Sequence, residues 1–514
     1  MEETPGDVRT NEDLTEATAA GLRWITYSRV GIEVLLLVSM VVLARLIPPA
    51  AFGVVAVVMI VQELTLTLPM ESISSALVQR RSITREHLQG GLMLGLLGGC
   101  VLAVVTLVIS HFLVASIYGV ETAHLMMLVA PCFVLGAVNA IPLAVLRRRL
   151  AFKTIGIIVI VSTLTRTSLT VGLAFAGLDA SALVLGTIAS LLVGIAMALY
   201  AAPIPLPRWN RRAIGDLLPY GGPASLASLA WTGFRNGDYA IIGARLGPVQ
   251  AGLYWRGYQL AVDYQRKISI VMTEMAFPVL SRTAGTDEML ALRQRMVQLL
   301  TVALFPLLVL LVLLAPVVVP WLFGPAWEGA VRPAQILAAG GAATLVIDAA
   351  GSGLAASGRT KAMLGYGVAH FVVYAGAVWF VAARGLVAVA IAAAIVHTIF
   401  LFVAYQILLG GRGARAMRAL WGDVAAAMTS CVALAAAGIP TELALKGANA
   451  PVLVHLTLVT AAGGLAYLIV LRMWFPQSWN DVRAAMRRLM PSAGLRLLAR
   501  LPKPLVARRS GSAA

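Results

Sequence analysis

Three polar residues lie close together in an otherwise apolar part of the chain, in the segment TGFRNGDYAIIG: Arg235, Asn236 and Asp238. The guanidinium group of Arg235 offers paired donors that match phosphate oxygens, so this residue is the strongest candidate for binding an anionic ligand. The alternative is an internal ion pair between Arg235 and Asp238, which are three residues apart. We expect the helix to be broken at Gly233 and Gly237, which would expose its backbone to a cavity.

Two carboxylates lie deep in apolar runs at corresponding places in the chain. Glu63 and Asp263 are each about eleven residues into a run, which places them close to the bilayer midplane at about 1.5 Å per residue. A carboxylate at this depth can take up a proton from one side and release it to the other, which predicts a role in ion coupling. For Asp263 the alternative is a permanent pair with Arg266 or Lys267, which follow it by one helical turn.

The remaining intramembrane charges divide by sign. The basic ones extend the cationic set that we expect to line a substrate-binding cavity, and they are Arg29, Arg166, Arg256, Arg266 and Lys267. The acidic ones are candidates for ion coupling or gating, and they are Glu33, Asp238, Glu274 and Asp348. Arg29 and Glu33 can instead pair with each other across one turn. Arg166 has no acidic neighbour in its own run, so we expect it to meet a charge from elsewhere.

Signatures of soluble enzymes are missing from the sequence, which has no phosphate-binding GxxxxGK[ST], no HExxH and no nucleophile elbow. Its three cysteines lie in apolar runs without metal-ligand spacing, so we interpret them as packing thiols. We therefore expect a transporter rather than an enzyme. No metal site or cofactor is predicted, apart from H⁺ or Na⁺ as a coupling ion.

The composition requires a membrane protein. Of the 514 residues, 60% are hydrophobic and only 12% are charged, which is too apolar for a soluble fold. The net charge of +17 comes from short basic clusters between apolar runs, so membrane orientation explains it better than nucleic-acid binding. The N-terminus is acidic and polar, and we expect no cleavable signal peptide.

The apolar runs predict an all-α polytopic protein with fourteen transmembrane helices of about 20 residues each. We place them near 24–44, 53–75, 90–112, 124–146, 155–177, 181–202, 218–244, 251–276, 296–319, 331–355, 362–383, 386–409, 421–439 and 451–472. Basic residues gather in alternate loops, which places both termini in the cytoplasm.

A short repeat divides the chain into halves. Residues 44–48 read ARLIP and residues 244–248 read ARLGP, and each motif precedes a glycine and an apolar run. This predicts two six-helix bundles related by a pseudo-twofold axis along the membrane normal. The expected organisation is a cytoplasmic tail (1–20), two bundles (21–207 and 208–411), two additional helices (412–474) and a basic cytoplasmic tail (475–514). The basic tail fits either a helix on an anionic leaflet or a solvated segment.

Several segments together resemble one family of membrane proteins. WITYSRVGIEVLLLVSMVVLARLIPPAAFGVVAVVMIVQE and FRNGDYAIIGARLGPVQAGLYWRGYQL are similar to the Wzx-type polysaccharide biosynthesis flippases, which belong to the multidrug/oligosaccharidyl-lipid/polysaccharide exporter superfamily. LRRRLAFK and LAASGRTKAMLGYG also fit this family. The resemblance implies two bundles around a central cationic cavity, and alternating access driven by a proton or sodium gradient.

The function implied is translocation of an undecaprenyl-diphosphate-linked oligosaccharide to the outer leaflet of the bacterial inner membrane, for lipopolysaccharide or exopolysaccharide export. Two alternatives are a cation-coupled multidrug or metabolite antiporter of the same fold and a membrane-embedded saccharide polymerase. Membrane lipid, a polysaccharide polymerase and glycosyltransferases are candidate partners. We expect a monomer that binds no nucleic acid.

Overall fold

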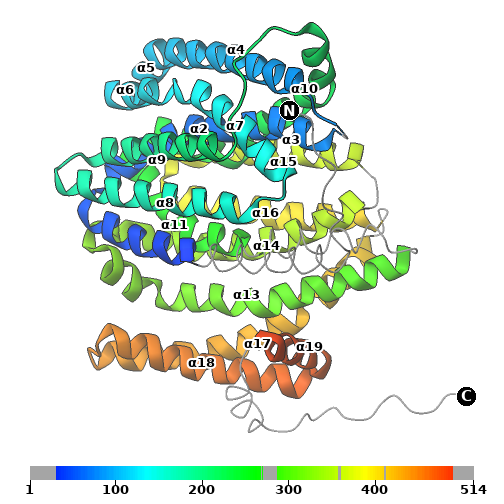
Figure 1. Ribbon diagram of the computed structural model, residues 1–514. Helices are drawn as coiled ribbons and strands as arrows, with labels where there is room; N and C mark the ends of the chain where they lie inside the picture. Colours follow the sequence, from blue (N-terminus) through cyan, green and yellow to red (C-terminus); the bar gives the residue numbers. More distant parts are fainter. Residues whose placement is uncertain are drawn as a thin grey trace, which may run out of the picture. The chain divides into compact units, whose positions relative to one another are not determined.

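The computed structural model describes residues 31–80, 82–267, 269, 286–356, 360–409 and 413–489 (Figure 1). Among them are helices and no strand. Two residues of the predicted site, Arg29 and Glu274, lie outside these ranges. The chain divides into two compact units, which end and begin at Gly252 and Leu253. This division lies after the repeat boundary predicted at 207.

The first unit begins with a helix over residues 31–46. It continues with α2 (Pro49–Pro69), η1 (Met70–Ser74), α3 (Ser75–Gln79), α4 (Arg85–Ile109), η2 (Ser110–Val114), α5 (Ala115–Tyr118), α6 (Val120–Val129), α7 (Cys132–Arg148), α8 (Phe152–Phe175), α9 (Asp179–Ala201) and α10 (Arg211–Leu246). Helices α8 and α9 pack side by side, as do α4 and α7 (Figure 1). The helix α11 (Pro248–Tyr258) crosses the boundary between the units.

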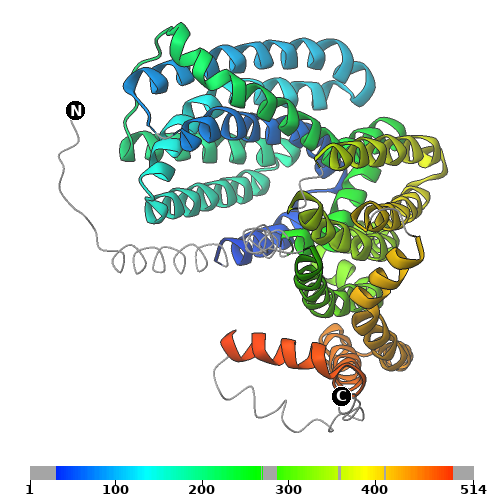
Figure 2. The same cartoon turned by 90° about the vertical axis from the view of Figure 1, so that its right-hand side faces the viewer.

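The second unit contains η3 (Gln259–Asp263), α13 (Thr286–Phe323), η4 (Pro325–Ala330), α14 (Val331–Ala356), α15 (Thr360–Val381), η5 (Ala382–Arg384), α16 (Leu386–Leu408), α17 (Gly413–Gly447), α18 (Val452–Trp474) and α19 (Pro476–Leu489). Helices α17 and α18 form a closely packed pair, visible in orange in Figure 2. The amphipathic α19 packs on α13 and α18, where Trp479 is buried beneath Arg472.

Eleven helices among the described residues are long and apolar enough to cross a membrane, and each coincides with a predicted span. A multi-pass membrane protein is thereby confirmed. The other three predicted spans are 24–44, 218–244 and 251–276. Their described parts fall on the helix over 31–46, on α10, and on the region of α11 and η3, while residues 24–30, 268 and 270–276 lie outside the described ranges. The total of fourteen and the side on which the termini lie stay predictions.

The break predicted in α10 at Gly233 and Gly237 is wrong, because the helix is continuous from Arg211 to Leu246. A glycine weakens a helix interior by only about 1 kcal/mol relative to alanine. The packing of α10 against α2 and α4 offsets a cost of this size. The backbone at this position therefore stays hydrogen-bonded within the helix rather than open to a ligand.

The repeat motif produces a reciprocal contact between the first turns of α2 and α11. A Cβ atom added at Gly53 would lie 1.7 Å from the carbonyl oxygen of Pro248, and one added at Gly252 would lie 1.9 Å from that of Pro49. Each glycine is the fifth residue of its helix, and each helix begins with proline, whose missing N–H costs nothing there. This exchange of equivalent contacts supports the predicted internal repeat.

Two residues, Ile47 and Pro48, connect the helix over 31–46 to α2. In the second copy of the repeat a single residue, Gly247 with φ of 84°, connects α10 to α11. Gly53 and Gly252 are consequently out of the 200-residue register that the motif predicts. The π-helical turn η3, which ends at Asp263, holds roughly one residue more than an α-helical turn. The extra residue restores the register, which supports the predicted equivalence of Glu63 and Asp263.

We predict that Gly53→Ala lowers the free energy of unfolding by about 1–3 kcal/mol, because the added methyl group collides with backbone that cannot rotate away. Thermal unfolding in detergent micelles measures the effect. Gly98→Ala is the matched control, since nothing lies within 4 Å of its added Cβ. Equal unfolding midpoints for the two variants would contradict the close approach.

Candidate functional site

The best-defined polar site in the first unit joins α2 to α10. The Nη1 atom of Arg235 lies 3.4 Å from Oε1 of Glu63, and Nδ2 of Asn236 donates to Oε2 of Glu63 at 2.9 Å. Asn236 also donates to the carbonyl oxygen of Thr232 at 3.0 Å, which orients its amide group. Both carboxylate oxygens of Glu63 are therefore bound by neighbouring residues of α10.

This site is only half-buried. The side chains of Arg235 and Glu63 are 34% and 32% exposed, so both can be reached from outside the helix pair. Asp238, one turn further along α10, is 2% exposed, and its carboxylate accepts a hydrogen bond from the backbone N–H of Tyr239. Burial thus separates Glu63, which a ligand or proton can reach, from Asp238.

Close packing holds α2 and α10 in this arrangement. A Cβ atom at Gly136 of α7 would lie 1.9 Å from the carbonyl oxygen of Thr65, so only glycine lets α7 support α2 there. At the other end of the site, the hydroxyl of Tyr118 donates to the carbonyl oxygen of Ala240 in α10 at 2.9 Å. These contacts fix which faces of α2 and α10 meet in this structure.

Arg166 lies in the middle of α8, and its side chain makes no ion pair or hydrogen bond with any residue in the described ranges. Its backbone faces α9, because a Cβ atom at Gly186 would lie 3.0 Å from the Arg166 carbonyl oxygen. The nearby hydroxyls of Thr163 and Thr165 donate to carbonyl groups one turn back. The predicted role of Arg166 in binding an anion stays a prediction.

The second unit holds the other predicted cations in different ways. Arg266 Nε lies 3.6 Å from Oδ2 of Asp348 on α14, so the structure brings these two predicted residues together. The ammonium group of Lys267 lies 5.2 Å from the centre of the Tyr264 ring. Asp263, at the end of η3, and Glu33, in the first described helix, are both partly buried.

Arg256 does not fit the ligand-binding role that we predicted for it. The residue is 3% exposed, and its guanidinium carbon lies 4.8 Å from the ring centre of Trp327 and 5.2 Å from that of Phe323. Its Nη1 atom donates to the side chain of Gln259 at 2.8 Å. Because cation–π contacts and burial hold this charge inside the second unit, we remove Arg256 from the ligand set.

The sequence did not predict one buried ion pair, between Arg293 and Asp423. Arg293 of α13 lies 2.9 Å from Oδ2 of Asp423 on α17, and the two side chains are 3% and 1% exposed. The hydroxyl of Tyr405 on α16 donates to the same carboxylate and accepts from Arg293. Three helices meet at this cluster, and it ties the additional helix α17 to the second bundle. Arg293 follows an acidic stretch near a predicted loop, so its sequence suggested only an orientation signal.

His370 and His397 pack together in the second unit, with ring centres 5.2 Å apart. His370 stacks on Phe400, and Nδ1 of His397 is bonded to the carbonyl oxygen of Ala393.

The part of the chain that the structure describes contains no group of three or more residues suited to bind a metal ion.

We predict that Glu63 and Arg235 are energetically coupled by about 0.5–3 kcal/mol in a double-mutant cycle, because each single change leaves a charge uncompensated. The variants are Glu63→Gln, Arg235→Gln and their combination, with unfolding in detergent as the measurement. A control cycle pairs Glu63→Gln with Arg211→Gln, which lies about 36 Å along α10 from Arg235. Additivity in both cycles would exclude the pair.

Arg293→Ala is expected to lower the free energy of unfolding by about 3–5 kcal/mol, because it leaves the buried carboxylate of Asp423 without its counter-charge. Thermal unfolding again provides the measurement. Arg295→Ala, an exposed arginine two residues away, should change stability by less than about 0.5 kcal/mol. A similar effect of the two substitutions would show that the triad adds no stability.

Comparisons with known proteins agree with this architecture. A family model described as "Polysaccharide biosynthesis protein" matches residues 42–332, more than half of the chain. The chain is 26% identical over 400 residues to the "Uncharacterized membrane protein in cps region" of Klebsiella pneumoniae, covering 76% of this chain and 82% of that protein. It is 25% identical over 350 residues to the "Lipopolysaccharide biosynthesis protein WzxC" of Escherichia coli (strain K12), covering 67% and 71% of the two chains.

The fold also has a solved counterpart. The structure "Lipid II flippase MurJ, inward closed conformation" matches with a TM-score of 0.67 over 91% of this chain and 99% of that chain, at 12% identity. An identity this low establishes likeness of fold and no more. The family model and the relatives confirm the resemblance seen in the sequence: the chain belongs to the polysaccharide biosynthesis protein family of Wzx-type membrane proteins, within the multidrug/oligosaccharidyl-lipid/polysaccharide exporter superfamily.

Proposed function

We propose that the chain is a flippase, a secondary transporter that moves an undecaprenyl-diphosphate-linked oligosaccharide from the cytoplasmic to the outer leaflet for cell-surface polysaccharide export. The observation that carries the proposal is the partly exposed pair of Arg235 and Glu63, which joins the membrane-spanning helix α2 to α10. Family membership and the Escherichia coli relative, a lipopolysaccharide biosynthesis protein, support a role in polysaccharide biosynthesis. The flippase with the same fold supports transport of a lipid-linked substrate.

Arg235 suits a diphosphate headgroup because its guanidinium group can hold two phosphate oxygens at once. In this structure its charge is balanced by Glu63 at 3.4 Å, a distance at the long end of ion pairing. A ligand phosphate can replace this carboxylate as the partner of the arginine. Asn236, which holds the other oxygen of Glu63, keeps the carboxylate in place during the exchange.

Arg166 is the second cation that we assign to the headgroup. A charged side chain within a membrane span costs a few kcal/mol unless an opposite charge or water offsets it. Among the described residues, no opposite charge is bonded to the Arg166 side chain. This is what we expect of a residue whose charge is balanced by a bound anionic ligand. Arg266 and Lys267 complete the proposed cationic set, and Asp348 balances the charge of Arg266.

Coupling to an ion follows from the same pair. When Glu63 takes up a proton it loses its attraction for Arg235, so the arginine becomes free for the substrate phosphate. A coupling ion must bind the two states of the transporter unequally, and a carboxylate that is paired in one state and free in the other meets this requirement. Asp263 at the equivalent repeat position, with Glu33 and Glu274 as further candidates, is the proposed counterpart in the second half.

We predict that Arg235→Ala and Arg166→Ala each reduce headgroup translocation by about 10- to 100-fold, the loss expected for a charged hydrogen bond worth about 1.5–3 kcal/mol. The assay uses liposomes that contain the protein and lipid-diphosphate oligosaccharides, with and without an imposed pH gradient. Arg235→Lys should recover only part of the activity, because an ammonium group cannot form the paired contact.

Arg384→Ala is the matched control, since it removes an exposed arginine from a turn and should leave translocation unchanged. Full translocation by both cavity variants, inserted at normal levels, would refute the assignment of these residues. A wild-type protein that exports organic cations and moves no saccharide headgroup would instead identify an antiporter.

A further inference from the structure

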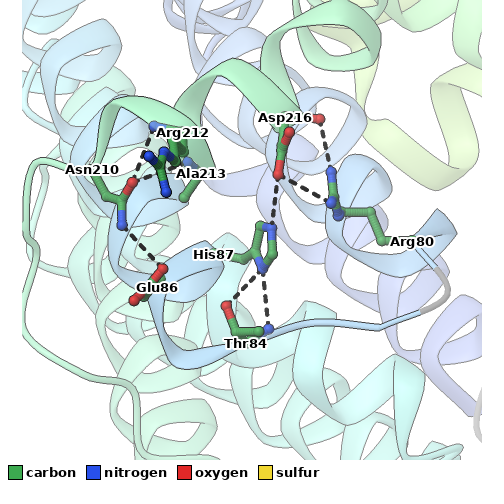
Figure 3. A network of polar contacts seen from close by, with 8 residues as sticks. All are labelled: Arg80, Thr84, Glu86, His87, Asn210, Arg212, Ala213 and Asp216. Carbon is green, nitrogen blue, oxygen red and sulfur yellow. Dashed lines mark hydrogen bonds and ion pairs between the residues drawn. The ribbon is translucent and has the colours of Figure 1, made fainter.

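A polar network outside the proposed site joins the loop after α3 to the beginning of α10 (Figure 3). Oδ2 of Asp216 accepts a hydrogen bond from Nη2 of Arg80 at 3.1 Å and lies 3.2 Å from Nε2 of His87. Nη1 of Arg80 donates to the backbone carbonyl oxygen of Asp216, also at 3.1 Å. Asp216 is thus held through both its side chain and its backbone.

The hydrogen bonds of His87 define its tautomer. The backbone N–H of Thr84 donates to Nδ1 of His87 at 3.1 Å, so Nδ1 is the acceptor and the proton is on Nε2, which faces Asp216 (Figure 3). One imidazole ring therefore caps the first turn of α4 and binds α10. This arrangement makes the start of α4 and the start of α10 parts of a single polar structure.

The first residues of α10 are bound to α4 a second time. Oδ1 of Asn210 caps α10 by accepting the backbone N–H groups of Arg212 and Ala213, both at 3.1 Å. Its Nδ2 atom donates to Oε2 of Glu86 at 3.2 Å. The same asparagine therefore starts one helix and attaches it to another.

Arg148 holds the loop that carries Arg80 in place. Nη1 of Arg148, at the end of α7, donates to the carbonyl oxygens of Leu77 and Val78 at 3.1 Å and to that of Arg80. These carbonyl groups end α3 and have no partner within the helix. The network thereby rests on α7, another helix of the first unit.

Apolar packing reinforces the polar contacts. Leu217 is 1% exposed and belongs to a buried cluster with Leu77 and Ile141. A Cβ atom at Gly90 of α4 would lie 3.2 Å from Cβ of Ala213, so the two helices nearly touch. The ion pairs are partly exposed and contribute little by themselves, whereas the buried leucine and the glycine contact favour a lasting attachment.

Directly after residue 217, α10 contains residues that weaken an α-helix. The segment LPYGGP brings two prolines, Pro219 and Pro223, into the helix interior on either side of Gly221 and Gly222. Each proline removes one backbone hydrogen bond, and the glycines lower the resistance to bending. The helix is therefore attached up to residue 217 and easily bent around Pro219 and Pro223.

We propose that residues 210–217 form an anchor that stays attached to α4 and α7 throughout the transport cycle, so that α10 bends only beyond Leu217. The inference rests on the proposed transport function. It assigns the first two turns of α10 to the first moving body, although the repeat places them in the second half. Arg235 and Asn236, beyond the bend, can then change their pairing with Glu63 while the start of the helix remains in place.

A disulfide that locks the contact tests this proposal. The variant has its three cysteines replaced by alanine. In it, Gly90→Cys and Ala213→Cys place their Cβ atoms 3.2 Å apart, just below the range of about 3.5–4.5 Å found in disulfides. The pair Gly95→Cys and Ala137→Cys is the matched control, because it locks α4 to α7 at a Cβ distance of 3.0 Å. Headgroup translocation is measured for the oxidised and the reduced proteins.

We expect the oxidised Gly90/Ala213 protein to translocate within twofold of its reduced form, like the control. A loss of more than tenfold on oxidation that dithiothreitol reverses, with the control unaffected, would overturn the anchor and identify a gate that must open. If wild-type protein moves no headgroup, the proposed function fails separately, and a distance measurement still decides the anchor.

That measurement places spin labels on two exposed arginines, as Arg85→Cys and Arg211→Cys, in the same cysteine-free protein. Inward- and outward-facing states are populated by changing pH and by adding lipid-diphosphate oligosaccharide. The anchor predicts one narrow distance distribution in every condition. A second distance, or a distribution that shifts between conditions, would overturn it.

Discussion

Charge inside an apolar solvent is the constraint on which this structure depends. An ionisable side chain within a membrane span is costly unless an opposite charge or water offsets it, and three such charges here find partners on helices far apart in the chain. Glu63 meets Arg235, Arg266 meets Asp348, and Arg293 meets Asp423. Each pair requires two helices to present particular faces to each other, so the charges constrain the rotation of the helices that carry them.

Glycine makes these pairings possible, because short carboxylate side chains reach a partner only when helices approach closely. Gly136 lets α7 contact the backbone of α2 near Glu63, and Gly90 lets α10 contact α4. Gly53 and Gly252 do the same for the two copies of the repeat. In a membrane, where apolar side chains gain little by leaving lipid, close contact between helices relies on small residues of this kind.

The degree of burial separates structural charges from those that can work on a ligand. Arg293 and Asp423 are almost fully buried and share Tyr405, so exchange of partners there would leave a charge uncompensated. Arg235 and Glu63 are about one-third exposed, and a phosphate or a proton can reach them. Arg256 looked like a ligand-binding cation in the sequence, yet its place between Phe323 and Trp327 makes it part of the core.

The sequence alone determined the helical membrane class, most of the spans, the repeat and the family, since these depend on hydropathy and local motifs. It also singled out Glu63, Arg235 and Asn236 as separate candidates. Only the tertiary structure decided that they bind one another, that Arg293 and Asp423 form a buried pair, and that α10 stays continuous through Gly233 and Gly237. The physical reason is that the rotation of each helix about its own axis depends on contacts between residues more than 100 positions apart. Hydropathy does not determine that rotation.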